Sequence, residues 1–208
     1  TVDRIRGSIT ALVTPMQADG GVDEDRYAAF MDWQITEGTH GLVPMGTTGE
    51  SATLSTEEHL EVIKRTIDVV AGRVPVVAGT GSNATEEAMH QTLEAQRLGA
   101  DACLLVTPYY NRPTQEGLYQ HYKAIADATA VPIVLYNVPP RTGCDMQADT
   151  VARLSEIDGI VGIKEACGDA QRVAAIKGAV ADDFFVLSGE DAQTLQMLEL
   201  GAVGTISV

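Results

Sequence analysis

The sequence is short of cationic side chains. Lysine and arginine together number 14, against 29 aspartates and glutamates, which gives a formal net charge of −15 over 208 residues. A protein that binds the phosphate backbone of a nucleic acid, or an anionic lipid surface, needs a basic face. We therefore expect neither a nucleic acid nor a membrane among the partners of this protein.

Cysteine is also scarce, with Cys103, Cys144 and Cys167 and no Cys-x-x-Cys pair. An odd number of cysteines without such a pair predicts reduced thiols and a cytoplasmic protein. The four histidines are scattered without the spacing of metal ligands, so no metal is expected. Thr1–Gly7 contains no apolar stretch, and no run approaches the roughly 20 apolar residues of a membrane span. These features predict neither a signal peptide nor a transmembrane helix.

Short apolar runs recur along the whole chain. Each is nearly continuous in apolar character, which is typical of strands buried on both faces. The runs are Ile9–Val13, Gly41–Met45, Val74–Ala78, Ala102–Val106, Ile133–Asn137, Ile160–Lys164, Phe184–Ser188 and Gly204–Val208. They predict eight strands.

Helix signals lie between these runs. Ser55–Glu58 has the sequence of a capping box, and Asp23 is a candidate N-cap. Gly38, Gly72 and Gly99 stand where a helix would end before the next strand. Apolar residues at helical spacing follow these signals, namely Tyr27, Phe30 and Ile35, then Leu60, Ile63, Ile67 and Val70, then Leu118, Tyr122 and Ile125, and finally Val173, Ile176 and Val180.

Alternation of strand and helix predicts a parallel sheet with right-handed crossovers, and eight units indicate a (β/α)8 barrel. An open doubly wound sheet would need a glycine-rich nucleotide loop, but Thr14–Met16 follows the first run and Gly79–Gly81 lacks the third glycine. We expect residues 1–208 to form the barrel's catalytic domain. The last predicted strand coincides with the end of the sequence, so the barrel is expected without its eighth helix or a C-terminal helical region.

Reactive groups in such a barrel lie where the strands end. Lys164 closes the apolar run that starts at Ile160. Burial would disfavour its ammonium form, and a neutral amine can attack a carbonyl to form a Schiff base. The alternative is a structural lysine paired with Glu165 or another carboxylate.

Other strand ends carry further candidates. Tyr136 is placed to relay protons, or to be a core tyrosine with a tethered hydroxyl. Thr47 and Thr48, between two glycines, suit a ligand carboxylate or a tight turn. Arg141, in a proline-rich loop, suits bidentate binding of a carboxylate or a solvated surface position.

Several of these residues belong to longer motifs. Gly41–Glu50 resembles the first signature of the dihydrodipicolinate synthase / N-acetylneuraminate lyase superfamily. Tyr136–Gly143 and Gly162–Ala166 resemble the second. Within that superfamily, Thr107–Pro113 and Pro140–Gly143 are similar to the dihydrodipicolinate synthase family. The resemblance extends from Gly7 to Val208 and implies a class I aldolase-type lyase on a (β/α)8 barrel.

The resemblance implies a role for each matching residue. Lys164 would form the Schiff base with pyruvate, and Tyr136 would donate and accept protons. Thr47 and Tyr110 would complete the proton relay, with Tyr110 contributed by a second subunit across a tight dimer interface. A homodimer or homotetramer is therefore implied.

Substrate contacts follow from the same resemblance. Thr48 and Ile206 would contact the bound pyruvate, and Arg141 would hold the carboxylate of L-aspartate 4-semialdehyde. The implied product is 4-hydroxy-tetrahydrodipicolinate, in the diaminopimelate route to lysine, and no cofactor is implied. Two alternatives remain open: a lyase for N-acetylneuraminate or 2-keto-3-deoxy sugar acids, and an inactive barrel fragment.

The resemblance also implies feedback inhibition by L-lysine. Glu87 would pair with the ligand ammonium and His59 would hydrogen-bond to it. Alternatively, Asn83 caps a helix, His59 is solvated and Glu87 is a first-turn acid. One position of the expected pocket carries Thr56 where some lysine-sensitive members have a histidine. The full expected pocket consists of Ser51, Ala52, His59, Asn83, Glu87 and Tyr109.

Overall fold

The computed structural model describes residues 2–208. Eight strands form one sheet in the order β2-β1-β8-β7-β6-β5-β4-β3, and the hydrogen-bonded neighbours are parallel. The strands are β1 (Gly7–Ala11), β2 (Gly41–Val43), β3 (Val77–Gly79), β4 (Ala102–Val106), β5 (Ile133–Asn137), β6 (Ile160–Glu165), β7 (Phe185–Ser188) and β8 (Gly204–Ser207).

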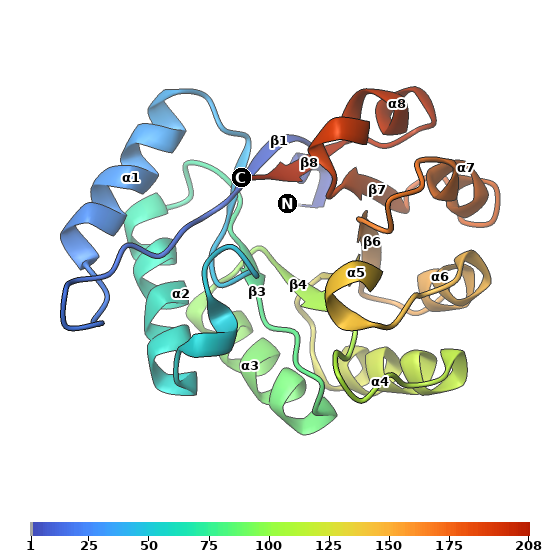
Figure 1. Cartoon of the computed structure of the whole chain (residues 1–208), viewed down its shortest axis with the longest axis horizontal. Helices are drawn as coiled ribbons and strands as arrows, with labels where there is room; N and C mark the ends of the chain where they lie inside the picture. The colour runs from blue at the N-terminus through green and yellow to red at the C-terminus, as the bar shows by residue number, and fades with distance from the viewer. Residues whose placement is uncertain (1) are drawn as a thin grey trace.

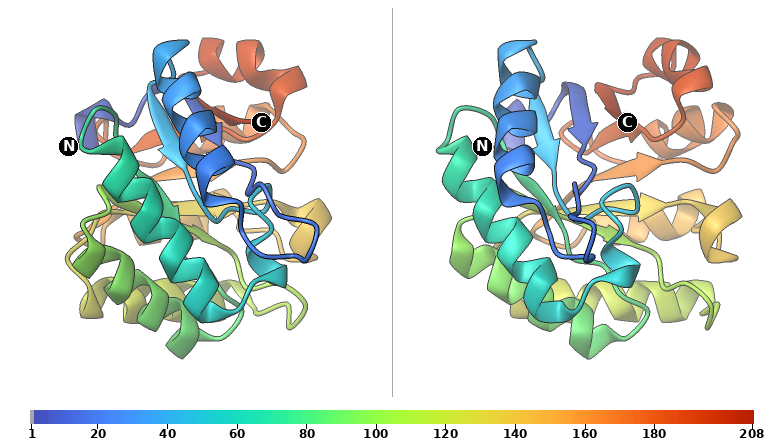
Figure 2. Two further views of the ribbon diagram at one scale, coloured as in Figure 1. Left: turned by 90° about the vertical axis from the view of Figure 1, so that its left-hand side faces the viewer. Right: turned by 60° about the vertical axis from the view of Figure 1, so that its left-hand side comes forward.

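Helices surround this sheet, and the strands lie inside their ring (Figure 1). They are α1 (Glu24–Thr36), α2 (Thr56–Val70), α3 (Thr85–Leu98), α4 (Gln115–Ala128), α5 (Pro139–Thr142), α6 (Ala148–Ser155), α7 (Gln171–Lys177) and α8 (Thr194–Glu199). Figure 2 shows α1, α2 and α3 packed side by side outside the strands. The predicted (β/α)8 architecture is confirmed. Because α5 and α6 both lie between β5 and β6, the helix labelled α8 precedes β8 and is not the helix that would follow it. No helix found in residues 2–208 is both long and apolar enough to cross a bilayer.

The barrel closes between β2 and β3, the first and last strands in the sheet order. Leu42 and Val76 form an isolated parallel bridge there, and the Leu42 N–H donates to the Pro75 carbonyl at 3.0 Å. The Gly79 N–H donates to the Pro44 carbonyl at 2.9 Å. A Cβ atom on Gly79 would lie 2.1 Å from the Met45 carbonyl oxygen, so only glycine allows the two backbones to approach this closely.

Apolar residues form two layers because successive side chains of a strand point to opposite faces. In β5, Ile133 and Leu135 pack with the helices, whereas Val134 and Tyr136 belong to the inner cluster that fills the barrel. In β6, Ile163 packs outward. This alternation decides which residues at the strand ends face the interior.

Local signals in the sequence account for several helix boundaries. The Asp23 side chain accepts from the Arg26 N–H and begins α1, and Ser55 with Glu58 forms the predicted capping box of α2. Gly99 adopts a positive φ at the end of α3, as predicted. At the end of α2, however, Ala71 is the left-handed C-cap, one residue before the predicted Gly72.

Other boundaries differ from the predicted ones. β3 begins at Val77, not Val74, because the Val76 N–H is bound by the Asp101 carboxylate at 2.9 Å. β1 begins at Gly7, which pairs with Gly204 of β8, and ends before Val13. Val180 lies beyond α7, which ends at Lys177. The proline-rich segment predicted as a loop contains α5.

The barrel closure predicts a large effect of Gly79→Ala. The added methyl group would overlap the Met45 carbonyl, so the free energy of unfolding should fall by about 3 kcal/mol or more. Chemical denaturation of both proteins measures this. Gly178→Ala is the matched control. Gly178 has helical backbone angles, and a Cβ atom there would lie 3.3 Å from its nearest neighbour, the Ala174 carbonyl oxygen. Equal losses in the two variants would contradict the role given to Gly79.

Candidate active site

A cavity of about 410 Å³ opens at the carboxyl ends of the strands. Its walls come from β1, β2, β4, β5, β6 and β8, from α5 and from the loops after β2 and β7. The structure brings six of the predicted site residues together in this lining: Thr47, Thr48, Tyr136, Arg141, Lys164 and Ile206. Residues from five separate parts of the chain therefore meet in one space, as expected for a barrel.

Lys164 lies at the end of β6 with its side chain inside the barrel, and it is only 7% exposed. Burial lowers the pKa of its amine to about 8, the Asp191 charge opposes that fall and the Arg141 charge adds to it. Its Nζ lies 4.4 Å from the centre of the Tyr136 ring. A substantial fraction of the amine is therefore neutral near physiological pH and is available as a nucleophile.

The alternative pairing of Lys164 with Glu165 is not found. Glu165 follows Lys164 in β6 and therefore points to the opposite face, where it binds the Asn137 amide. Lys164 makes no ion pair within the described part of the chain. The carboxylate whose charge acts on its amine belongs to Asp191, in the loop after β7.

Tyr136 lies beside Lys164, in register with it across the β5–β6 pair. Burial raises the pKa of its phenol, while the Thr47 side chain and the Arg141 charge oppose that rise. The phenol is thus protonated at neutral pH, and the Thr47 side chain is the hydrogen-bonding group that acts on its pKa. This arrangement suits a group that passes a proton through a neighbouring hydroxyl.

The loop that carries Thr47 and Thr48 is a compact turn. The Gly49 N–H donates to the Gly46 carbonyl at 3.1 Å, and the Thr14 hydroxyl donates to the Gly49 carbonyl at 2.8 Å. These bonds close the turn after β2 and tie it to Thr14, in the segment that follows β1. Thr47 and Thr48 therefore belong to a tight turn and also line the cavity, so the two alternatives for these residues are compatible.

Arg141 lies on α5, exposed at the cavity mouth. Tyr110 has a positive φ of 72° and is 90% exposed. It does not belong to the lining that contains Tyr136. The structure therefore does not bring Tyr110 to the other predicted catalytic residues within this subunit.

A second cavity, of about 370 Å³, adjoins the first and shares Thr47, Val138 and Arg141 with it. Five of the residues predicted to bind lysine line it: Ser51, Ala52, His59, Glu87 and Tyr109. Asn83 is outside this lining, but its amide donates to the Tyr109 carbonyl at 3.1 Å.

The alternative roles for these residues are partly corrected. Ala84, not Asn83, is the N-cap of α3, and it forms no side-chain cap bond. His59 is buried, not solvated, and its Nε2 lies 2.7 Å from the Gly79 carbonyl oxygen. Burial lowers the pKa of His59, so the ring is neutral and donates that hydrogen bond.

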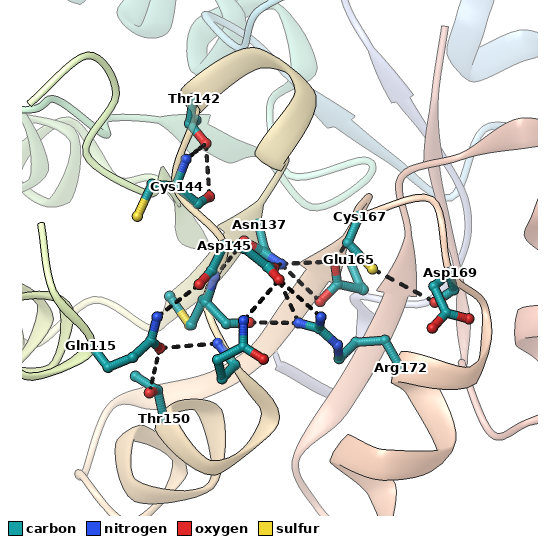
Figure 3. A network of polar contacts seen from close by, with 12 residues as sticks. Gln115, Asn137, Thr142, Cys144, Asp145, Thr150, Glu165, Cys167, Asp169 and Arg172 are labelled. Carbon is teal, nitrogen blue, oxygen red and sulfur yellow. Dashed lines mark hydrogen bonds and ion pairs between the residues drawn. The ribbon is translucent and has the colours of Figure 1, made fainter. Parts of the chain in front are cut away.

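The sequence did not single out a polar network behind the first cavity. Figure 3 shows the Asn137 amide between the carboxylates of Asp145 and Glu165, with Arg172 beside Asp145. Asn137 and Glu165 are almost fully buried. The available signal was their position immediately after Tyr136 and Lys164. Their partners could not be found because Asp145 and Arg172 belong to other segments.

No group of three or more His, Cys, Asp or Glu side chains between residues 2 and 208 is arranged to hold a metal ion. The polar groups that line the cavity are an amine, a phenol, three hydroxyls, a guanidinium and the carboxylates of Glu190 and Asp191.

Comparison with known proteins places this site in context. The model of the dihydrodipicolinate synthetase family matches residues 4–208. The chain is similar to the 4-hydroxy-tetrahydrodipicolinate synthase of Ectopseudomonas mendocina, with 57% identity over 98% of this chain and 70% of that protein. It is 56% identical to the enzyme of Pseudomonas aeruginosa over the same shares.

Solved structures are also similar. The chloride-inhibited dihydrodipicolinate synthase from Acinetobacter baumannii, complexed with pyruvate, has a TM-score of 0.96 and 55% identity, over 98% of this chain and 70% of that one. The enzyme from Cyanidioschyzon merolae with lysine bound has a TM-score of 0.96 and 42% identity, over 99% of this chain and 70% of that one.

The buried Glu165 carboxyl predicts a pH-dependent stability. Burial raises its pKa to about 7, against 4.5 for an ordinary glutamate, so the folded protein keeps this proton after the unfolded chain has lost it. The stabilisation that the bound proton of Glu165 gives to the folded state is full below pH about 4.5. It is lost as the pH rises through about 7, and the free energy of unfolding changes by about 3 kcal/mol as a result.

Glu165→Gln removes this titration. The free energy of unfolding of the native protein, minus that of the variant, should fall between pH 4.5 and 7.5. Urea denaturation at several pH values measures this difference, which cancels the titration of other groups. A constant difference across that range would show that Glu165 is ionised with its ordinary pKa.

Proposed function

Because the chain belongs to the dihydrodipicolinate synthetase family, we propose that it condenses pyruvate with L-aspartate 4-semialdehyde to form 4-hydroxy-tetrahydrodipicolinate. This reaction is the first step of the diaminopimelate route to lysine. The observation that carries the proposal is the buried Lys164 amine, with its pKa lowered to about 8, in contact with Tyr136 inside the cavity.

The reaction begins at Lys164. Its neutral amine attacks the keto carbon of pyruvate, and loss of water gives an imine between Nζ and that carbon. Removal of a proton from the pyruvate methyl group then gives the enamine. Thr48 and Ile206, which line the same cavity, contact the bound pyruvate.

Tyr136 moves the protons of these steps. Its phenol lies beside the Lys164 amine and the Thr47 side chain opposes the rise in its pKa, so a proton can pass along these groups. Tyr110 of a second subunit completes the relay. The 90% exposure of Tyr110 supports this role, because an exposed side chain is free to enter the site of another copy. The proposed assembly is therefore a homodimer or a homotetramer.

The second substrate enters at the cavity mouth. The enamine carbon attacks the aldehyde carbon of L-aspartate 4-semialdehyde, whose carboxylate is held by the Arg141 guanidinium. The amino group of that substrate then attacks the imine carbon, closes the ring and releases the Lys164 amine. An exposed guanidinium on the short helix α5 is well placed for a substrate that arrives after pyruvate.

The second cavity is the proposed site of feedback inhibition by L-lysine. Glu87 would pair with the ligand ammonium, and His59 borders the same space. Thr47 and Arg141 line both cavities, so a ligand in the second cavity would contact groups used in the first. This shared wall supplies a physical route for inhibition.

We place the protein in the cytoplasm and assign catalysis to the barrel domain that residues 1–208 form. The support for the cytoplasm is that Cys103, Cys144 and Cys167 are free thiols. Burial raises the pKa of the Cys103 thiol to about 12 and that of Cys167 to about 11, so neither is prepared for redox chemistry.

Borohydride reduction in the presence of pyruvate tests the central step. Intact mass should show one pyruvyl adduct on the native protein and none on Lys164→Ala, because no other lysine lies in the cavity. Lys123→Ala, an exposed helical lysine paired with Asp127, is the control and should keep the adduct. The initial rate of adduct formation should rise with pH and level off above about 8, as the Lys164 amine loses its proton. An adduct of equal yield in Lys164→Ala would rule out this assignment.

Substitution of Arg141 tests the second substrate. Arg141→Ala should lower kcat/KM for L-aspartate 4-semialdehyde by roughly 10- to 100-fold, the loss expected for a charge-assisted bidentate contact. Arg141→Lys keeps the charge but not the bidentate geometry, so its kcat/KM should lie between those of the native protein and Arg141→Ala. The pyruvate adduct should change much less. Equal losses in adduct formation and in use of the second substrate would contradict this role.

Calorimetric titration tests the lysine pocket. L-lysine should bind the native protein, and binding should be lost in Glu87→Thr because the ligand ammonium loses its carboxylate partner. Glu86→Thr changes the adjacent acid of the same helix and should leave binding intact. Unchanged binding in Glu87→Thr would place the lysine elsewhere.

A further inference from the structure

Two pairs of residues face each other where β5 and β6 end. Tyr136 is in register with Lys164, and Asn137 is in register with Glu165. Because neighbouring residues of a strand point to opposite faces, the first pair faces the cavity and the second faces the helices. The outer pair is thus one residue away from both groups that the reaction uses.

The Asn137 amide connects the outer pair. Its Nδ2 donates to Glu165 Oε1 at 3.0 Å and to Asp145 Oδ1 at 2.9 Å, and its Oδ1 accepts from the Met146 N–H at 3.0 Å (Figure 3). Both N–H groups and the carbonyl oxygen of the amide are therefore used. A fully buried amide with all its hydrogen bonds formed holds a single orientation.

Each end of this connection is anchored. The Arg172 guanidinium binds both oxygens of Asp145, at 3.1 and 2.9 Å, and also the Met146 carbonyl at 2.8 Å. Glu165 Oε1 accepts a second bond from the Cys167 N–H at 2.9 Å. The Asn137–Glu165 pair is therefore fixed to α7 and to the segment after β6.

The alignment of β5 with β6 shifts by one residue near the start of the pair, before the ladder continues to Asn137 and Glu165. Ile133 pairs with Ile160 but Val134 pairs with Gly162, so β6 contains one extra residue near its start. Such a bulge changes the local twist and shifts the alignment of the following residues. The alignment of Tyr136 with Lys164 is set after the bulge, where the side-chain pair joins the two strands.

The buried Glu165 carboxyl, which makes the bond to Asn137, is energetically costly. Glu165 is 1% exposed, and the one ion pair formed by its neighbour Arg172 goes to Asp145. A buried carboxyl that relies on neutral donors is less stable than a neutral side chain of similar shape. Such local costs are concentrated at functional sites.

We propose that Asn137 and Glu165 are positioning residues, whose hydrogen-bonded pair sets the separation of the Tyr136 phenol and the Lys164 amine from the outer face of the barrel. This inference rests on the proposed Schiff-base reaction. The pair touches no substrate and acts through the two catalytic side chains. The combined length of the Asn137 and Glu165 side chains is therefore the property that sets this separation.

Two conservative variants separate length from charge. Glu165→Asp keeps the carboxylate but shortens the side chain by about 1.5 Å, so the pair forms only if the strand ends move together. Glu165→Gln keeps the length and offers a carbonyl oxygen to the Asn137 amide. Because a misplacement of about 1 Å can cost up to 100-fold in rate, kcat should fall roughly 10- to 100-fold in Glu165→Asp and by less than about threefold in Glu165→Gln.

The apparent KM for pyruvate and the amount of borohydride-trapped adduct at saturating pyruvate should stay near native values in both variants, because Lys164 remains in place. Asn137→Ala, which opens the pair from the other strand, should reproduce the loss of kcat seen in Glu165→Asp. Thr150→Val is the structural control, since it removes the Thr150–Gln115 hydrogen bond from the outer part of the same network. Its kcat should be unchanged. Thermal unfolding confirms that each variant is folded at the assay temperature.

A larger loss of kcat in Glu165→Gln than in Glu165→Asp would mean that the charge acts, and would overturn the proposal. Native kcat in Glu165→Asp and Asn137→Ala would overturn it too, as would an equal loss in Thr150→Val. A native protein that forms no pyruvate adduct would instead refute the proposed reaction, so the two failures are distinct.

Discussion

Burial of the Lys164 amine is the constraint on which the site depends. An ammonium group is costly to remove from water, and the protein reduces this cost by lowering the pKa of the amine to about 8. The Tyr136 ring lies against Nζ, and Asp191 supplies an opposing charge from the loop after β7. The fold thereby maintains a nucleophile that would be fully protonated at the surface.

Barrel geometry makes this burial possible. Parallel strands bring their carboxyl ends to one face, and the alternation of side chains gives each strand end one residue inside and one outside. The inside residues of β5 and β6 form the proposed reactive pair, and the outside residues form its proposed support. Gly189 shows how tightly the amine is enclosed, because a Cβ atom there would lie 2.7 Å from Lys164 Cε.

The two cavities have different walls but share three residues, Thr47, Val138 and Arg141. Thr47 acts on the Tyr136 phenol, and Arg141 influences both Tyr136 and Lys164 through its charge. Both also border the second cavity. A ligand there could change catalysis through displacement of these side chains alone, without a rearrangement of the barrel. The proposed regulation by lysine would then be coupled to the chemistry through direct contact.

The sequence by itself determined the eight strands, several helix boundaries and six residues of the first cavity, because apolar runs, capping residues and long motifs are local signals. It placed Lys164, Tyr136 and Arg141 at strand ends. Only the tertiary structure decided which way each side chain points, and hence that Glu165 binds Asn137 and not Lys164. The lowered pKa of Lys164, the exposure of Tyr110 and the contact of Asp145 with Arg172 also depend on segments distant in the sequence. Burial and long-range contacts have no local signal, so these properties emerge only when the barrel closes.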